Sequence, residues 1–238
     1  MGFIYFIRHA QAGTRTNYDV LSDVGQEQAR LLGVHLAAQG VAFKAIYAGS
    51  LRRQQHTAEI AGLELARAGI AVPDLEVDTR WDEFSLASVY TSIVRRLMED
   101  SPEFARDVAE MQEALRTDPR STRGATGRCD LAVIRAWMDD RYPDCEGEKW
   151  AAFRDRVNGC LPDLCASACD ESIAIFTSAT PIAILTAAAL DLNQEKLISV
   201  LGVIYNSSIT AMRPNADGLR LFSFNSTPHL SEDLRTLR

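Results

Sequence analysis

The stretch Phe3-Ile4-Tyr5-Phe6-Ile7-Arg8-His9-Ala10 decides how the rest of the chain is interpreted. Its first five residues are almost continuously apolar and rich in strand-forming types, which is typical of a central strand buried on both faces. The apolar run ends at Ile7, and the pair Arg8-His9 follows at once. Because ligands bind beyond the carboxyl ends of the strands in open α/β sheets, this pair marks an expected binding site.

The segments after this strand alternate between helical and strand patterns. Ser22 predicts the start of a helix that Gly40 ends, and a second helix follows the dipeptide Gly49-Ser50. Further strands are expected at 45–48, 75–78 and 172–177, with an antiparallel pair at 207–212 and 219–224. This order predicts an α/β fold, a three-layer sandwich in which helices flank a mostly parallel central sheet.

Two further helices are expected on either side of the strand at 172–177. The segment 150–168 has the apolar spacing of one amphipathic helix. After the strand, Thr180 is expected to cap a helix that has Pro181 at its first position, where the missing N–H of proline costs nothing.

The region from Phe84 to about Glu146 has a different pattern of apolar residues. Apolar residues recur every three or four positions without a clear strand, which predicts two helices. Within it, the segment 117–130 is rich in Gly, Pro, Ser, Thr and Arg and is expected to be a loop. We therefore expect a single domain over residues 1–238 with a helical cap insertion at about 84–146.

Composition and charge exclude several classes of protein. The 238 residues are 47% apolar and 24% charged, and no apolar run approaches the roughly 20 residues that cross a bilayer. The formal charge of −7 argues against sequence-independent binding of nucleic acid. The five cysteines contain no C-x-x-C pair, and the first residues lack the features of a signal peptide. We expect a cytoplasmic protein that binds neither membranes nor nucleic acid.

A series of short motifs runs through nearly the whole chain outside the insertion. They are Phe6-Ile7-Arg8-His9-Ala10, Leu21-Ser22-x-x-Gly25-x-x-Gln28-Ala29, Leu51-x-Arg53-x-x-x-Thr57-Ala58-Glu59, Glu83, Gly147-Glu148, Phe153-Arg154-x-Arg156-Val157 and the apolar strand 173–176. In this order and spacing, the set resembles the histidine phosphatase superfamily, also called the phosphoglycerate mutase-like family. The resemblance implies the same α/β fold and phosphoryl-transfer chemistry.

The resemblance also implies roles for particular residues. His9 is the expected nucleophile and forms a phosphohistidine that water later hydrolyses. Arg8 and Arg53 suit phosphate binding, because a planar guanidinium can donate two hydrogen bonds to phosphate oxygens. A carboxylic acid must protonate the leaving alkoxide. By motif position this acid is Glu83, with the neighbouring Asp82 as the alternative.

The chain departs from the family pattern after the strand at 172–177. Family members carry a second active-site histidine there, in a Ser-His-Gly-Gly-like turn, whereas this chain has Thr177-Ser178-Ala179-Thr180-Pro181. Ser178 stands at the histidine position, and its hydroxyl, with amides of the following helix, is expected to bind a phosphate oxygen. Arg15 and Arg80 are further candidates for substrate contacts. The four scattered histidines predict no metal site, and we expect no cofactor.

These observations favour a metal-independent phosphatase that acts on a small phosphorylated metabolite. Two alternatives stay open. One is a phosphoglycerate mutase-type phosphotransferase, which must protect its phosphohistidine from water. The other is a non-catalytic protein that binds phosphorylated ligands, because the second histidine is missing. A homodimer also stays open as the oligomeric state.

Overall fold

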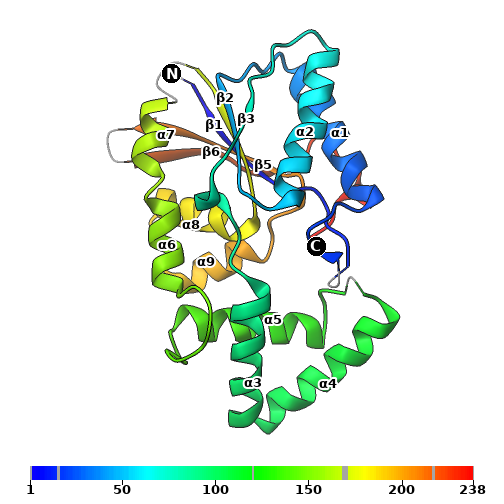
Figure 1. The fold of residues 1–238 in the computed structure, drawn as a ribbon, viewed down its shortest axis with the longest axis vertical. Coiled ribbons are helices and arrows are strands. Elements are labelled where there is room, and N and C mark those ends of the chain that lie inside the picture. Colours follow the sequence, from blue (N-terminus) through cyan, green and yellow to red (C-terminus); the bar gives the residue numbers. More distant parts are fainter. Residues whose placement is uncertain (1, 15–16, 120, 168–170, 216–217, 238) are drawn as a thin grey trace. The chain divides into compact units, whose positions relative to one another are not determined.

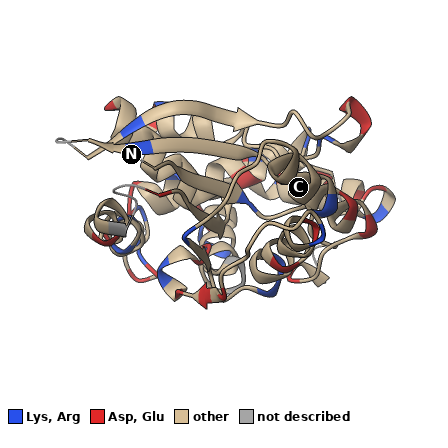
Figure 2. Cartoon of the chain, turned by 90° about the horizontal axis from the view of Figure 1, so that it is seen from above, with Lys and Arg blue, Asp and Glu red and all other residues tan. Residues whose placement is uncertain are grey.

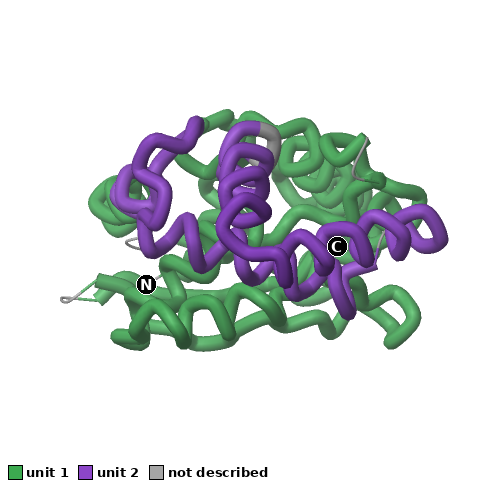
Figure 3. The backbone as a smooth tube through the Cα atoms, turned by 90° about the horizontal axis from the view of Figure 1, so that it is seen from below, with its two compact units in different colours: residues 1–83, 156–238 green, residues 84–155 purple. Residues whose placement is uncertain are grey.

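The computed structural model describes residues 2–14, 17–119, 121–167, 171–215 and 218–237. Its contacts divide the chain into two compact units (Figure 3). The first unit, 1–83 with 156–238, carries the sheet, and the second unit, 84–155, is built from helices. The expected helical insertion falls inside the second unit.

Within the described residues, six strands form one sheet in the order β3-β2-β4-β1-β5-β6 (Figure 1). The strands are β1 (Ile4–Arg8), β2 (Ala45–Ala48), β3 (Leu75–Val77), β4 (Ile173–Thr177), β5 (Ile209–Asn215) and β6 (Gly218–Ser226). The first four are parallel neighbours, whereas β5 and β6 pair antiparallel. The predicted α/β class with a mostly parallel sheet is confirmed, and the carboxyl ends of four strands meet at one edge.

Helices α1 (Asp23–Ala38) and α2 (Arg52–Arg67) cover one face of the sheet (Figure 1). Ser22 caps α1 as predicted, because its side chain accepts a hydrogen bond from an amide of the first turn. Gly33 lets the two helices approach closely, since a Cβ atom there would lie 2.5 Å from Ala61 O. The apolar residues of both helices share one buried cluster with Ile7, Ile46, Ala174 and Phe176.

The segment expected to form one helix over 150–168 forms two. Helix α6 (Trp150–Asn158) ends before Gly159, and α7 (Leu161–Ser167) starts two residues later with Pro162 in its first turn. The prediction of a continuous helix was wrong, because proline is tolerated in a first turn and interrupts a helix elsewhere. Helix α7 contacts β5.

Helix α8 (Ala179–Leu190) begins earlier than predicted and contacts β1 and β6. Ser178, and not Thr180, is its N-cap residue, and the Ser178 side chain makes no capping bond. The Thr180 amide instead donates to the Glu83 carboxylate over 3.2 Å, so a distant side chain satisfies this helix start. A further helix, α9 (Gln194–Leu201), contacts α8.

The second unit contains helices α3 (Thr91–Asp100), α4 (Pro102–Thr117) and α5 (Ala125–Met138), which contact one another. The prediction of a loop over 117–130 was wrong for its second half, where α5 begins. Gly127 favoured a loop in the sequence, but it allows a close approach here. A Cβ atom at this position would lie 2.7 Å from Thr122 O.

An aromatic cluster forms the centre of the second unit. The Trp137 ring lies 4.5 Å from the Phe84 ring and 5.2 Å from the Trp150 ring, measured between centroids. Phe153 completes the cluster and is fully buried. These large apolar side chains give the helices a core of their own.

Charged residues lie mainly in helices and loops, and few are found in the strands (Figure 2). Among the described residues, none of the helices combines the length and apolarity that crossing a membrane requires. The cysteines at 129, 145, 160 and 165 are free thiols.

Candidate functional site

Four chain segments meet at the carboxyl ends of the parallel strands in the first unit. The His9 amide donates to Thr177 O over 2.8 Å, which ties the end of β1 to the end of β4. The Gly49 amide donates to Phe176 O over 3.2 Å and brings the start of α2 to the same edge. The Thr177 hydroxyl donates to Trp81 O over 2.6 Å and fixes the segment that follows β3. Residues far apart in the sequence therefore share one edge.

The imidazole of His9 is held in one tautomer. Its Nδ1 lies 2.8 Å from Ala10 O, and because a carbonyl oxygen only accepts, Nδ1 carries the proton. The other nitrogen, Nε2, accepts a hydrogen bond from Arg53 Nε over 3.2 Å. Burial, followed by the charges of Arg53 and Arg8, lowers the pKa of His9 well below its ordinary value. The ring is therefore neutral at pH 7 and keeps a lone pair on Nε2.

Arg53 lies in the first turn of α2 and is buried at 5% exposure. Besides its bond to His9, its Nη1 donates to Asp19 Oδ1 over 3.0 Å. The Tyr18 ring centroid lies 4.8 Å from Arg53 Cζ, and the Tyr18 and His9 rings meet edge to face with centroids 6.4 Å apart. A buried guanidinium thus stands beside Nε2 of His9.

The Arg8 side chain is also buried, and backbone carbonyls hold it. Its Nη1 donates to Ile204 O, and its Nη2 donates to Leu237 O over 2.8 Å. The charge lies close enough to His9 to lower the pKa of the ring. Arg8 therefore adds positive potential to the site while carbonyl oxygens occupy part of its guanidinium.

Ser178 lies at the start of α8 and is 1% exposed. Its Oγ accepts a hydrogen bond from Gln54 Nε2 over 2.9 Å. Gln54 is also fully buried and donates from the same nitrogen to Trp81 O over 3.1 Å. Gln54 was missed by the sequence analysis, although its position directly after Arg53 in a helix N-terminal turn was a usable signal.

Glu83 and Asp82 have different surroundings. The Glu83 carboxylate accepts the Thr180 amide, which places it at the N-terminus of α8 next to Ser178. The Asp82 carboxylate accepts two hydrogen bonds from Ser50, from its amide over 2.5 Å and from its hydroxyl over 2.6 Å. Asp82 is therefore engaged in fixing the turn before α2, whereas Glu83 lies at the start of α8, where Ser178 is the N-cap residue.

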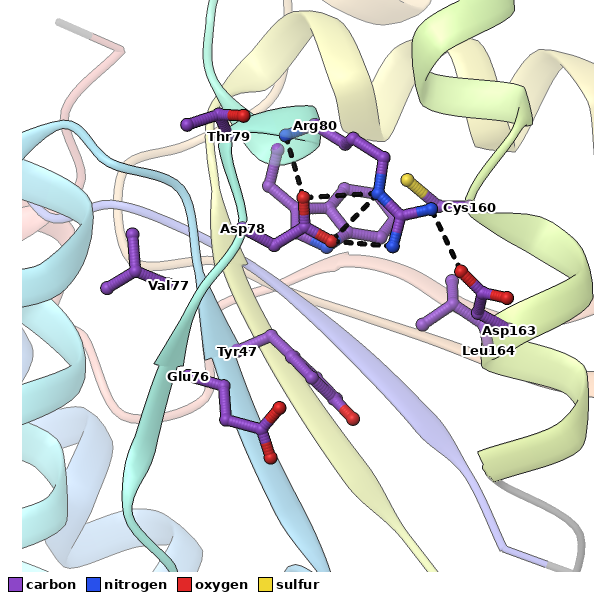
Figure 4. A pocket seen from close by; sticks show the side chains of 10 residues that line it. Tyr47, Glu76, Val77, Asp78, Thr79, Arg80, Cys160, Asp163 and Leu164 are labelled. Carbon is purple, nitrogen blue, oxygen red and sulfur yellow. Dashed lines mark hydrogen bonds and ion pairs between the residues drawn. The ribbon is translucent and has the colours of Figure 1, made fainter.

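A separate cavity of about 550 Å³ lies beside β2 and β3 (Figure 4). Arg80 lines it, and its guanidinium is bonded to Asp78 over 2.8 Å and to Asp163 over 2.9 Å. Neither His9 nor Arg53 lines this cavity. The structure does not bring Arg80 to the cluster around His9, because two carboxylates hold the side chain elsewhere.

The structure thus brings together the predicted His9, Arg8 and Arg53 at one strand edge, with Ser178 and Glu83 at the adjoining start of α8. Arg15 lies outside the described residues. Among the residues that are described, no group of three or more His, Cys, Asp or Glu side chains could hold a metal ion. The sequence analysis also missed Tyr18 and Asp19, which belong to a loop without periodic signal.

Comparison with known proteins identifies a family and several structures with the same fold. A model of the histidine phosphatase superfamily (branch 1) matches residues 4–129 and 128–227. No curated protein matches the sequence.

Several solved structures share the fold. A mycobacterial glucosyl-3-phosphoglycerate phosphatase in complex with VO3 has a TM-score of 0.60 and 22% identity, covering 95% of this chain and 100% of that one. A phosphoserine phosphatase mutant from Entamoeba histolytica, in complex with phosphoserine, has a TM-score of 0.60 and 16% identity, covering 97% and 100%. A phosphoglycerate mutase from Bacillus anthracis str. Sterne has a TM-score of 0.61 and 18% identity, covering 96% and 94%.

Proposed function

The chain belongs to the histidine phosphatase superfamily, branch 1, and from that premise we propose that it hydrolyses a small phosphate monoester through a phosphohistidine on His9. The observation that carries the proposal is the state of the His9 ring. Its Nδ1–H is committed to Ala10 O, and the lone pair of Nε2 points toward a buried guanidinium. This is the arrangement of a nucleophile beside a phosphate-binding cation.

In the first step, the lone pair of His9 Nε2 attacks phosphorus. An N–P bond forms, the ester P–O bond breaks, and the leaving alkoxide takes a proton from Glu83. The ring becomes a phosphoimidazolium whose Nδ1–H stays bonded to Ala10 O, which supports the new positive charge. Because its pKa is lowered, His9 enters this step unprotonated at neutral pH.

In the second step, water attacks the phosphorus atom and gives a proton back to Glu83. The N–P bond breaks, inorganic phosphate leaves, and His9 returns to its neutral state. One carboxyl group thus acts as general acid in the first step and general base in the second. The position of Glu83 beside Ser178, at the edge where His9 also lies, supports this assignment over Asp82.

The transferring phosphoryl group needs donors around its three oxygens. Arg53 can provide its Nε and Nη1 hydrogens once the phosphate replaces their present partners. Ser178 provides a hydroxyl where the family has a histidine, and Arg8 adds positive potential. No step requires a metal ion, and we therefore propose metal-independent hydrolysis.

The proposal is tested by incubating the protein with p-nitrophenyl phosphate and, separately, with phosphoglycerates. We expect phosphate release that excess chelator leaves unchanged, and an acid-labile phosphate on His9 in rapidly quenched samples. Transfer of phosphate between phosphoglycerate hydroxyls without release would identify a mutase. Binding of phosphate with neither reaction would identify a non-catalytic binding protein.

A further inference from the structure

A carboxylate already occupies donors beside His9 that a phosphate would use. Asp19 Oδ1 accepts a hydrogen bond from Arg53 Nη1 over 3.0 Å, and Asp19 Oδ2 accepts one from the Arg52 amide over 3.1 Å. This amide belongs to the first turn of α2, where Leu51 offers no side-chain cap. A guanidinium combined with a helix N-terminal amide is an anion-binding arrangement, and Asp19 is the anion that fills it.

We propose that Asp19 is a tethered competitor of the substrate phosphate, which must displace it from Arg53 before His9 reacts; this inference rests on the phosphatase function proposed above. Arg53 connects the two residues, because it donates from Nη1 to Asp19 and from Nε to His9 Nε2. In this state the guanidinium covers the lone pair that His9 needs for attack. A phosphate that accepts hydrogen bonds from both Arg53 donors releases Asp19 from Nη1 and the His9 lone pair from Nε.

The two members of the ion pair differ in their freedom to move. The Arg53 side chain is only 7% exposed, and it lies against the Tyr18 ring. The Asp19 side chain is 51% exposed, so its carboxylate can turn into water without disturbing buried packing. Displacement therefore moves Asp19 while Arg53 stays at the site to bind the phosphate.

The competition also selects among anions. A carboxylate ligand offers the same charge and the same two acceptor atoms that Asp19 already supplies to the Arg53 guanidinium and the Arg52 amide, and it lacks the advantage of tethering. A phosphate dianion brings about twice the charge and a third oxygen. Asp19 therefore weakens all anion binding, but it excludes singly charged carboxylates more effectively than phosphate.

The substitution Asp19→Asn tests this role. Asparagine keeps one oxygen that can cap α2, removes the charge and replaces the second acceptor oxygen with an NH2 group. We expect the variant to bind inorganic phosphate about tenfold more tightly in isothermal titration calorimetry, which corresponds to about 1.4 kcal/mol. The KM for p-nitrophenyl phosphate should fall by a similar factor. If the variant is unstable in a thermal melt, Asp19→Ser provides a second neutral capping residue for the same titration.

Glu59→Gln is the matched control, because Glu59 lies on α2 and pairs with Arg52 over 2.7 Å. Its side chain is about as exposed as that of Asp19. Unchanged phosphate affinity in this control is expected. Equal tightening in both variants would reduce the effect to net charge and overturn the inference. Equal or weaker phosphate binding by Asp19→Asn would overturn it too, with the proposed function intact if the unmodified protein still turns over. Absence of phosphate binding and turnover in the unmodified protein would overturn both.

Discussion

The side-chain amide of Gln54 donates a hydrogen bond to the hydroxyl oxygen of Ser178 over 2.9 Å, and both side chains are buried. Because the Ser178 oxygen accepts in this bond, its own O–H proton is left to be donated to another group. Gln54 therefore orients Ser178 as a hydrogen-bond donor at the start of α8, which the sequence pattern matches to the second histidine of the family. A serine in this setting can replace one function of that histidine, the donation of a proton in a hydrogen bond.

Ser178→Ala should lower kcat for p-nitrophenyl phosphate by up to about 10²-fold, because one preorganised donor to the transferring group is lost. Gln54→Leu should lower kcat in the same direction, since the Ser178 hydroxyl then loses its orientation. Steady-state kinetics on both variants check the expectation, with circular dichroism to confirm folding. Full activity in Ser178→Ala would show that its hydroxyl does not contact the phosphoryl group.

His9→Ala should abolish phosphatase activity, because it removes Nε2, the proposed nucleophile that accepts a hydrogen bond from Arg53. His56→Ala is the matched control, since His56 lies on α2 only three residues from Arg53 and has no role in the proposed reaction. We expect the control to retain most of its activity. Residual turnover of His9→Ala above the level of a blank would point to another nucleophile.

Glu83→Gln should slow hydrolysis of alkyl phosphates far more than hydrolysis of p-nitrophenyl phosphate. An alkoxide needs a proton as it leaves, whereas p-nitrophenolate leaves readily without one. Asp82→Asn should affect both substrates equally and lower the melting temperature, because Asp82 binds the Ser50 amide and hydroxyl. Parallel kcat/KM measurements on the two substrate types separate these patterns. Equal losses in Glu83→Gln would argue against its role as the acid.

Gly25→Ala and Gly62→Ala should change stability in opposite directions. A Cβ atom at Gly25 would lie 2.1 Å from Gln11 O, so the substitution forces the segment after His9 to shift and should cost about 1–3 kcal/mol. At Gly62 the nearest atom is 3.4 Å away, and alanine in this helix should stabilise the fold by up to about 1 kcal/mol. Urea unfolding of both variants measures the difference. Equal changes in the free energy of unfolding would contradict the close packing of α1 against the backbone of Gln11.

Stability should fall as the pH drops below about 6.5. Burial lowers the pKa of His229 to about 4, and the pKa of His9 is also lowered. The unfolded chain therefore binds a proton on His229 between about pH 6.5 and pH 4 while the folded chain does not, and the lowered pKa of His9 acts in the same direction. Each histidine can contribute a loss of at most about 1.4 kcal/mol per pH unit in that window. Urea unfolding at pH 7.5, 5.5 and 4.5 measures the slope, and His229→Gln should reduce it.

The sequence predicts much of the central framework because its signals are local. The apolar stretch before Arg8 predicted β1, and Ser22 predicted the start of α1; both were confirmed. Helix α5 was missed because Gly127 indicates a loop unless the close approach of Thr122 is known. That approach is a tertiary contact, which propensity alone does not contain.

Some residues of the candidate site could also be predicted from the sequence, and others could not. His9 and Arg53 follow from motifs at the ends of predicted elements, and the structure places them 3.2 Å apart. The contact of Arg8 with Leu237 could not be predicted, because its acceptor is a backbone carbonyl and every residue carries one. The role of Asp19 could not be predicted either, because its loop meets α2 only through a tertiary contact, the hydrogen bond from the Arg52 amide to the Asp19 carboxylate.

The bond between Arg8 and Leu237 O spans 229 positions of sequence. Helices α1 and α2 make contacts between neighbouring segments, and such structure forms early in folding. The candidate site, in contrast, needs segments from both extremes of the chain, and the loss of chain entropy precedes the contacts that compensate for it. We therefore expect the site to be among the last parts to become ordered during refolding from urea, so that the return of the proposed activity would report the completion of folding rather than its first collapse.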